Sequence, residues 1–555
     1  MDRRDFIAGA SVAVAAAGSS LTASAAQSAA GPAVRTQQGV LEGIEAGGVM
    51  QFRGVPFALP PVGDLRWRAP QRAAAWSGVR PAKAFSAASY QRRPLLPCLR
   101  ADGMSEDSLY LNVWTTSLSR TARQPVMVWL HGGGNLRGAG SEGFTDGSNL
   151  AKLGVTVVAP NYRLGAFGYL NDPVLGANFG FLDQVAALEW VRDNIDAFGG
   201  DPSRVLVFGY SAGAQAVRNL LRSPLAKGLF HRCVSQSGGG EPAARPAGPR
   251  PPPGSRVATE RLFRDLGTTD YAALRAVPAE RVLVASDAMR NDPVPAGGEG
   301  GRGLPTLEGG ARPAARLFWG PVDDDKMLMS DSFPAWGPDV PAIFSHCANE
   351  GRWTFDPLQA QRSLPDDIFP PAVVEATVRQ TAGANGEEAL RILNAEGGGA
   401  LAKLDRLFTT SGHRAGAYRA LERADREGRK VFHYEFSRVS PGRRMSNRLA
   451  FHGTDVYYVF GNLIPNFQAD PNHSSPDDDA FREGLYDDVD RQISREMQHA
   501  FVEFAKTGVP KRVDGAAWPQ FHSESPRYAA VGDTVSFSPY RPSALLSLLL
   551  GSRHA

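Results

Sequence analysis

Residues 204–221 constrain the fold of this chain more than any other stretch of its sequence. They begin with a short apolar run, residues 205–208, which is typical of a strand buried on both faces of a sheet. The motif Gly-Tyr-Ser-Ala-Gly follows at residues 209–213, and apolar residues at helical spacing come after it. A strand, a glycine-flanked serine and a helix in this order are typical of a nucleophile elbow, which directs the hydroxyl of Ser211 into an open site.

The five-residue motif is weak evidence on its own. Glycine occupies 60 of the 555 positions, so a pattern of this kind also arises by chance. The strand before it and the helix after it favour catalysis. A serine hydroxyl is a poor nucleophile unless a base takes its proton, an acid orients that base and backbone donors stabilise the oxyanion. A catalytic role for Ser211 therefore requires these groups elsewhere in the chain.

Strand-like runs alternate with helix-length segments, which predicts an α/β fold with a large, mostly parallel central sheet flanked by helices. Parallel strands place the turns that follow them along one edge of the sheet, where such folds build their sites. Two short alternating segments near the N-terminus predict an antiparallel hairpin at a sheet edge. The hairpin segments are residues 39–43 and 50–56, the other strand-like runs are 109–114, 126–130, 155–158, 205–208 and 430–436, and helical patterns cover 183–198, 400–426 and 493–506.

Charge and composition exclude several classes of partner. The net charge is only +3, and no basic cluster with interleaved aromatic residues is present, so we expect no nucleic-acid partner. After residue 30 no apolar run approaches 18 residues, so we expect no membrane span. The three cysteines, Cys98, Cys233 and Cys347, allow at most one disulfide. None lies in a Cys-x-x-Cys or Cys/His cluster, so we interpret them as buried thiols and predict no metal site.

The N-terminus has the pattern of a targeting segment. Residues 2–7 include Arg3 and Arg4 and resemble a twin-arginine export signal, followed by a mild apolar stretch. Small residues at 23–25 offer a cleavage site. We therefore expect residues 1–25 to be a signal peptide and residues 26–555 to be one domain, exported in the folded state to a bacterial periplasm or beyond. A buried N-terminal helix is the alternative.

A glycine run follows the strand-like segment 126–130, as His131 and Gly132 to Gly134. Glycines there allow backbone N–H groups to turn inward, as in the oxyanion loop of esterases. We predict that the N–H groups of Gly133, Gly134 and Ala212 form the oxyanion hole. A merely flexible loop is the alternative for the glycines. We interpret His131 as a structural residue of the loop, not as the base.

These motifs and several others occur in the order and spacing of type-B carboxylesterases, the cholinesterase and carboxylesterase/lipase branch of the α/β-hydrolase fold. The resemblance covers nearly everything after residue 35. It implies an α/β-hydrolase fold with antiparallel N-terminal edge strands and with loop and helix insertions over the site. The motifs are residues 131–134, 161–168, 178–184, 189–195, 198–202 and 209–213, flanked by 54–57, 66–70, 105–112, 504–508 and 518–519.

The resemblance implies the remaining members of a catalytic triad. The acid of the family is a glutamate before glycine after a strand, which matches Glu350; without the resemblance, a solvated loop carboxylate would be favoured. The base of the family lies in a His-Gly-x-acid pattern, which matches His452. The chain order Ser211, Glu350, His452 is that of the fold. A serine carboxylesterase that acts on small ester molecules, with no metal and no organic cofactor, is therefore expected.

Departures from the family pattern concern the substrate. Tyr210 stands where the family usually has a glutamate before the nucleophile, which makes choline esters poor candidates. The early disulfide of the family is lost at both ends, where Ser89 and Ser108 stand, and Cys98 lies within that former loop. Arg137 could meet an acidic acyl group, although a surface arginine is the simpler interpretation. Asp323 and Asp324 are interpreted as structural residues, not as metal ligands.

Two alternatives stay open. A lipase with long-chain substrates would share the triad, and a chain-length series of esters would separate it from an esterase. A non-catalytic binding or adhesion protein of the same fold is the second alternative, although such members lack the nucleophile that this chain has as Ser211. No heptads or repeats indicate an oligomeric state.

Overall fold

The computed structural model describes residues 31–92, 98–239, 254–289, 319–324, 326–328, 340–355, 365–445, 447–463 and 485–551. The predicted signal peptide, residues 1–25, lies outside these ranges. None of the helices in these ranges is long and apolar enough to cross a membrane.

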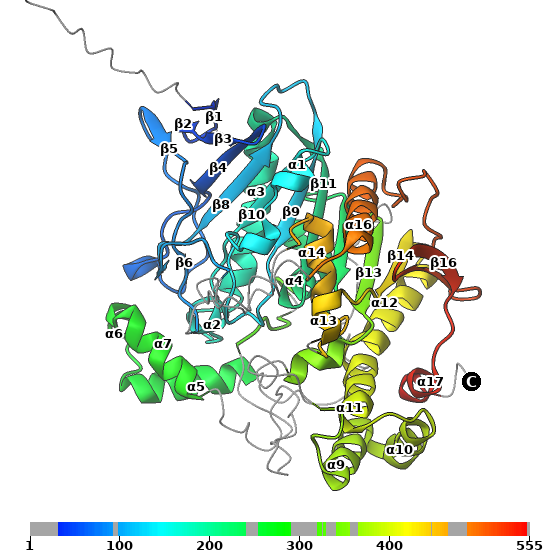
Figure 1. The fold of residues 1–555 in the computed structure, drawn as a ribbon. Coiled ribbons are helices and arrows are strands. Elements are labelled where there is room, and N and C mark those ends of the chain that lie inside the picture. Colours follow the sequence, from blue (N-terminus) through cyan, green and yellow to red (C-terminus); the bar gives the residue numbers. More distant parts are fainter. Residues whose placement is uncertain are drawn as a thin grey trace, which may run out of the picture.

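Among the described residues, eleven strands form one central sheet in the order β16-β15-β14-β13-β12-β11-β9-β10-β8-β4-β3 (Figure 1). The run from β10 to β15 is parallel, and antiparallel strands flank it on both sides. This confirms the predicted mostly parallel sheet. The strands are β3 (Ile44–Ala46), β4 (Val49–Pro56), β8 (Tyr110–Thr115), β9 (Gln124–Leu130), β10 (Thr156–Pro160), β11 (Gly200–Tyr210), β12 (Arg232–Gln236), β13 (Ala342–Cys347), β14 (Val431–Phe436), β15 (Arg527–Val531) and β16 (Val535–Pro539).

The N-terminal hairpin differs from the prediction. Strand β4 does pair near the sheet edge, but its antiparallel partners are β3 and β8, not residues 39–43. Those residues contain β2 (Val40–Glu42), which joins β1 (Ala33–Arg35) and β5 (Val79–Pro81) in a separate small sheet. The chain reverses between β3 and β4 at Gly47 and Gly48, which both have positive φ and so form the turn with little strain.

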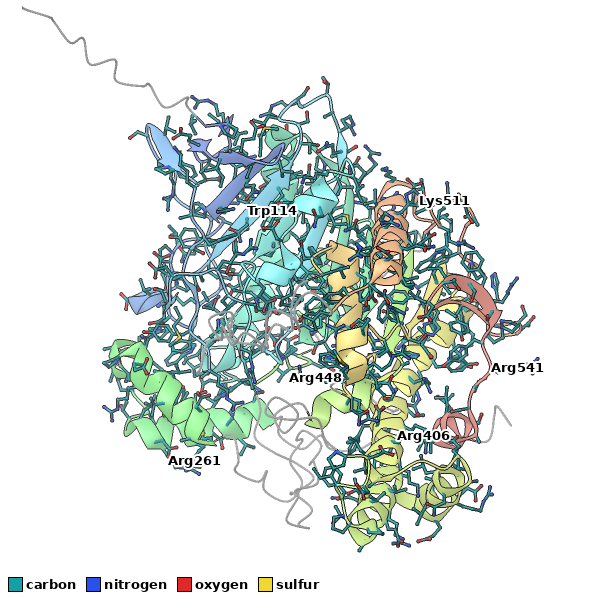
Figure 2. The ribbon with its side chains drawn as sticks, viewed as in Figure 1. Trp114, Arg261, Arg406, Arg448, Lys511 and Arg541 are labelled. Atoms are coloured by element: carbon teal, nitrogen blue, oxygen red, sulfur yellow. The ribbon has the colours of Figure 1, made fainter. Side chains whose placement is uncertain are left out.

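Side chains alternate between two buried faces along the central strands, as the period of a strand requires. On β9, Val126 and Val128 pack with one core cluster, whereas Met127 and Trp129 pack with the other. Both faces of the sheet are thus covered, which explains why these strands are continuous apolar runs. Figure 2 shows Trp114 of β8 within the sheet, whereas Arg261 lies at the periphery of the molecule.

Helices α3, α4 and α12 contribute to the first core cluster, and α1, α14 and α16 contribute to the second. Two further groups, α5–α7 and α9–α11, lie on either side of the lower part of the view in Figure 1 and have apolar clusters of their own. The helices are α1 (Ser148–Ala151), α2 (Gly165–Tyr169), α3 (Phe179–Asn194), α4 (Ala212–Leu221), α5 (Gly254–Leu266), α6 (Tyr271–Ala276), α7 (Ala279–Ala288), α9 (Pro371–Ala382), α10 (Gly386–Ala395), α11 (Ala400–Phe408), α12 (Ala415–Arg426), α13 (Pro441–Met445), α14 (Thr454–Phe460), α16 (Asp488–Thr507) and α17 (Ala544–Leu550).

Ser89 and Ser108, the positions where the resemblance implies a lost disulfide, lie in direct contact. The hydroxyl oxygens of Ser89 and Ser108 are 2.9 Å apart, and both residues are buried. Ser89 also donates to the carbonyl of Tyr162 at 2.8 Å. A hydrogen bond thus joins the positions that a covalent bridge would join. The three cysteine thiols are free; Cys233 and Cys347 are buried, and Cys98 is half-buried.

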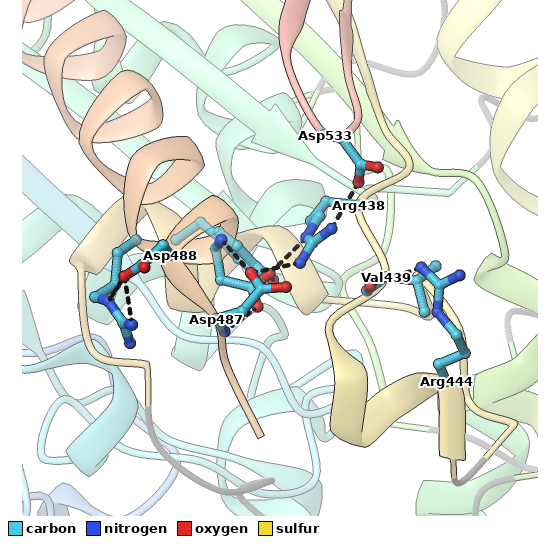
Figure 3. A network of polar contacts seen from close by, with 9 residues as sticks. Arg438, Val439, Arg444, Asp487, Asp488 and Asp533 are labelled. Carbon is cyan, nitrogen blue, oxygen red and sulfur yellow. Dashed lines mark hydrogen bonds and ion pairs between the residues drawn. The ribbon is translucent and has the colours of Figure 1, made fainter. Parts of the chain in front are cut away.

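A buried arginine fastens helix α16 to the sheet (Figure 3). Arg438 follows β14 and reaches Asp490, Asp487 and Asp533 at 2.6 to 2.7 Å. Asp487 and Asp490 also form a capping box that begins α16. Burial alone would lower the pKa of the Arg438 guanidinium. Its hydrogen bonds with these carboxylates have the larger, opposite effect, so the net pKa is raised and the cation is kept charged.

We predict that Arg438→Met lowers the free energy of unfolding by about 3–5 kcal/mol, because it leaves the fully buried carboxylate of Asp490 without its cation. Urea unfolding checks this. The matched control is Arg491→Met, which breaks the exposed pair with Asp488 and costs at most about 1 kcal/mol. Equal shifts in the two variants would contradict the role given to Arg438.

Candidate active site

Ser211 lies at the sharp turn between β11 and α4, as predicted. Its φ of 56° and ψ of −122° form a backbone conformation that non-glycine residues rarely adopt. Its N–H donates to the carbonyl of Gln236 at 2.9 Å, which ties the turn to the end of β12. Strain at one such residue is typical of functional sites, because the surrounding structure must hold it.

The glycines on either side of Ser211 are required by close packing. A Cβ atom on Gly213 would lie 2.0 Å from the carbonyl oxygen of Leu130, and one on Gly209 would lie 2.6 Å from the same oxygen. Strand β9 therefore approaches the turn so closely that no side chain fits. This confirms that the glycines at 209 and 213 are needed because the neighbouring chain leaves no room for a side chain.

Glu350 and His452 meet, although 102 positions separate them in the sequence. Glu350 follows β13 and His452 precedes α14, and Nδ1 of His452 donates to Oε2 of Glu350 at 2.5 Å. Oε1 of Glu350 accepts from the hydroxyl of Ser237 at 2.5 Å and from the N–H of Cys347 at 2.7 Å. The carboxylate thus lies between a histidine and two fixed donors.

The charge of Glu350 is stabilised in a buried position, since the residue is only 1% exposed. Burial alone would raise the pKa of this carboxyl group. The positive charges of His413 and His452 and the hydrogen bonds from His452 and Ser237 instead hold the pKa of Glu350 well below its usual range. An ionised carboxylate is the state that can orient an imidazole and stabilise its cation.

Tyr210 joins the turn at Ser211 to the loop of His452. Its ring centroid lies 6.0 Å from that of His452, and the ring stacks almost parallel on Trp129 at 5.8 Å. A Cβ atom on Gly453, the residue after His452, would lie 2.8 Å from the Tyr210 ring, and one on Gly132 would lie 2.6 Å from it. One aromatic ring therefore fills the space between the turn at Ser211, the glycine loop after β9 and the loop of His452.

The glycine loop after β9 contains two glycines with positive φ. Gly133 has φ of +103° and Gly134 has φ of +66°, conformations that glycine adopts at little cost. No described residue accepts a hydrogen bond from the N–H of Gly133, Gly134 or Ala212. The N–H of Ala212 belongs to the first turn of α4, where helical partners are absent.

His131 is a structural residue, as interpreted from the sequence. It is fully buried, its ring stacks on Tyr162 at 4.2 Å, and the hydroxyl of Tyr162 donates to its carbonyl at 2.6 Å. Burial lowers the pKa of His131 to about 4, so the ring is neutral near pH 7. It is also remote in sequence from the Glu350–His452 pair and makes no hydrogen bond with either residue.

Several contacts of the site carried no signal in the sequence analysis. Ser237, which anchors Glu350, stands in no recognisable motif. The ring centroid of His413 lies 5.1 Å from that of His452, although the sequence predicted only a helix for the segment that contains His413. Outside the site, Arg163 and Asp183 form a buried bidentate ion pair at 2.7 and 2.8 Å, which connects two of the matched motifs.

Other predicted residues lie in structural positions. Asp323 pairs with Arg222 at 3.0 Å, and Asp324 accepts N–H groups of the turn that follows it. Arg137 is half-buried, and its backbone carbonyl and side chain lie against Gly133. Neither aspartate belongs to a group of possible metal ligands among the described residues.

The sequence matches a known protein family over most of its length. A model described as "Carboxylesterase family" matches residues 30–542. The chain belongs to this family. As a carboxylesterase family member it is a carboxylic ester hydrolase with the α/β-hydrolase fold.

Curated carboxylesterase relatives cover most of the chain. A fumonisin B1 esterase of Sphingopyxis macrogoltabida is 33% identical over 88% of this chain and 84% of its own length. A para-nitrobenzyl esterase of Bacillus subtilis is 32% identical over 89% of this chain and 93% of its own length. A solved PNB esterase superposes with a TM-score of 0.73 at 30% identity, over 93% of this chain and 99% of its own.

A second carboxyl group, Glu142, is buried near this carboxylesterase site. It is 3% exposed, and no described residue forms a hydrogen bond with its Oε2 atom. Burial raises the pKa of the Glu142 carboxyl to about 8, so it is mostly protonated at pH 7. Burial, followed by the influence of Glu142, also raises the pKa of Tyr210 well above its usual value.

We predict that Glu142→Gln changes how stability depends on pH. Because the pKa of Glu142 is about 8 in the folded state and near its ordinary value of 4.5 in the unfolded chain, the folded state binds the extra proton between these values. The wild type must therefore lose stability as the pH rises from about 5 to 8. The variant cannot ionise there, so its stability relative to the wild type increases over this range and levels off above it.

Thermal unfolding at a series of pH values checks this prediction. Glu524→Gln, at an exposed position, is the control and follows the wild-type curve. Parallel curves for Glu142→Gln and the wild type would show that Glu142 has an ordinary pKa.

Proposed function

We propose that this chain is a serine carboxylesterase that hydrolyses esters through an acyl-enzyme on Ser211. The observation that carries the proposal is the buried 2.5 Å contact between Glu350 and His452, together with the ring of Tyr210, the residue before Ser211, which lies 6.0 Å from the ring of His452 between centroids. All three residues follow parallel strands or lie at the same edge of the sheet, where an α/β fold builds its site.

In this mechanism Nε2 of His452 takes the proton of Ser211 while the serine oxygen attacks the ester carbonyl. The Nδ1–H of His452 stays bonded to Glu350, which fixes the tautomer and stabilises the imidazolium. His452 then protonates the leaving alcohol. Water repeats the sequence on the acyl-enzyme and releases the carboxylic acid.

The proposed oxyanion hole is formed by the N–H groups of Gly133, Gly134 and Ala212. Two observations support it: these donors have no acceptor among the described residues, and the loop that bears the two glycines is held by hydrogen bonds. Gly138 exchanges hydrogen bonds with Gln91, and Tyr162 holds the carbonyl of His131. Fixed donors stabilise the charge of the transition state without reorganisation.

We further infer that the chain is exported, and that residues 1–25 are removed as a signal peptide. Arg3 and Arg4, with the apolar stretch and the small residues after them, support this inference. The sequence outside this segment has no feature that contradicts it.

The test of the mechanism is hydrolysis of 4-nitrophenyl acetate by the chain from residue 26 onward. We expect Ser211→Ala to lower kcat by at least about 10⁴-fold, because no other group forms the acyl-enzyme. Glu350→Gln lowers kcat by about 10⁴-fold through loss of the productive tautomer. A mechanism-based organophosphate label, located by mass spectrometry, falls on Ser211.

Ser525→Ala and Glu524→Gln, both at exposed positions, are the matched controls and retain the wild-type kcat. Activity that survives in Ser211→Ala would place the nucleophile elsewhere. A folded wild type without activity on simple esters and without labelling would support the non-catalytic alternative.

Substrate charge gives a second prediction. With Tyr210 neutral and Glu142 mostly protonated at pH 7, neither offers a negative charge to a cationic alcohol. We expect kcat/KM for acetylcholine to be no more than about threefold that for its neutral isostere, 3,3-dimethylbutyl acetate, because one exposed cation adds little binding energy without a partner. A preference of 100-fold for acetylcholine would show that another anionic group faces the site.

A further inference from the structure

His413 is brought to the triad by an unusual piece of helix. Residues Thr409–Arg414 form a π-helix between α11 and α12. Such turns are rare and occur mostly at functional sites, since each inserts an extra residue that the regular helix would not accommodate. The consequence here is that the ring of His413 lies 5.1 Å from that of His452, measured between centroids, and its Nε2 atom is 3.8 Å from Oε2 of Glu350.

The two oxygens of Glu350 have different surroundings. Oε1 is held by the hydroxyl of Ser237 and the N–H of Cys347, whereas Oε2 faces both histidines. One carboxylate oxygen and two imidazole nitrogens therefore converge. All three atoms lie within 4.8 Å of one another.

Two histidines and one carboxylate are a donor set that suits Zn²⁺, with a fourth position left for water. Tetrahedral Zn²⁺ with ligand bonds of about 2.0–2.2 Å places neighbouring ligand atoms roughly 3.3 Å apart. Nδ1 of His452 lies 2.5 Å from Oε2 of Glu350, so this distance would have to increase by less than about 1 Å. Nε2 of His413 lies 3.8 Å from the same oxygen, so that distance would have to decrease by about 0.5 Å. These are side-chain adjustments that leave the fold unchanged.

We propose that Glu350, His413 and His452 form an inhibitory binding site for one Zn²⁺ ion. When Zn²⁺ binds Nδ1 of His452, the N–H bond of that nitrogen breaks, its electron pair goes to the metal, and the proton is taken up at Nε2, so the ring keeps one proton. Nε2 then cannot accept the proton of Ser211, and the carboxylate of Glu350 is bound to the metal instead of the imidazole. Nothing is oxidised or reduced, and removal of the ion restores the tautomer that the reaction uses.

The exposure of the three ligands fits a site that is entered from one side. The side chain of His413 is 23% exposed, whereas that of His452 is 7% exposed and that of Glu350 is fully buried. His413 is thus the ligand that solvent reaches. The carboxylate contributes a negative charge inside the site, which compensates part of the charge of the ion.

The experiment is a titration of 4-nitrophenyl acetate hydrolysis with Zn²⁺, each variant being compared with its own metal-free rate. We expect the wild type to be inhibited by Zn²⁺ and to recover with EDTA. His413→Gln raises the Zn²⁺ concentration for half-inhibition at least about 10-fold, through loss of one of three ligands. His522→Gln, at a histidine whose side chain is 55% exposed, leaves that concentration unchanged.

A second readout needs no turnover, because the inhibition readout rests on the proposed function. Calorimetry of Zn²⁺ binding to Ser211→Ala, in which the three ligands are intact, shows about one ion per chain, and the added change His413→Gln weakens it by the same factor. Circular dichroism confirms that His413→Gln is folded. Equal half-inhibition in His413→Gln and the wild type, or no binding to Ser211→Ala, would overturn the proposal. If Ser211→Ala binds Zn²⁺ but the wild type hydrolyses no ester, only the proposed function would be contradicted.

Discussion

The buried charge of Glu350 is the constraint on which the site depends. A carboxylate that is 1% exposed stays ionised only where hydrogen bonds and opposite charges replace the water it has lost. The N–H of Cys347 comes from the end of β13, Ser237 directly follows β12, and His452 lies in the loop before α14. The ends of two neighbouring parallel strands therefore place two of the donors, so the sheet that builds the core also helps to fix the protonation state of this carboxyl group.

A second constraint is the lack of space around Tyr210. Its ring is stacked on Trp129 and borders Gly132 and Gly453, which belong to different loops. A displacement of any one of these loops would collide with the ring or leave a void beside it. Apolar packing thus aligns the turn at Ser211, the glycine loop after β9 and the loop of His452. Hydrogen bonds add to this by tying Ser211 to Gln236, by holding the glycine loop and by orienting the Glu350–His452 pair.

Much of this arrangement could be predicted from the sequence, since the parallel strands are buried on both faces and read as apolar runs, and the elbow requires glycine at positions 209 and 213. What could not be predicted depends on tertiary contacts. Residues 39–43 have the same alternation as a main-sheet strand, and pattern alone does not choose the sheet that a strand joins. His413 stands in a helical run whose π-turn leaves no periodic signal, and Ser237 and Arg163 matter only through partners distant in the chain.

The contact between Ser89 and Ser108 has a consequence for where the chain can mature. A covalent bridge forms only with an oxidant, whereas two hydroxyl groups form a hydrogen bond as soon as their segments come together. Two of the three thiols are enclosed in the core, and none is paired. The described part of the fold therefore needs no oxidant to reach this arrangement, a property that the proposed export of a folded chain would require.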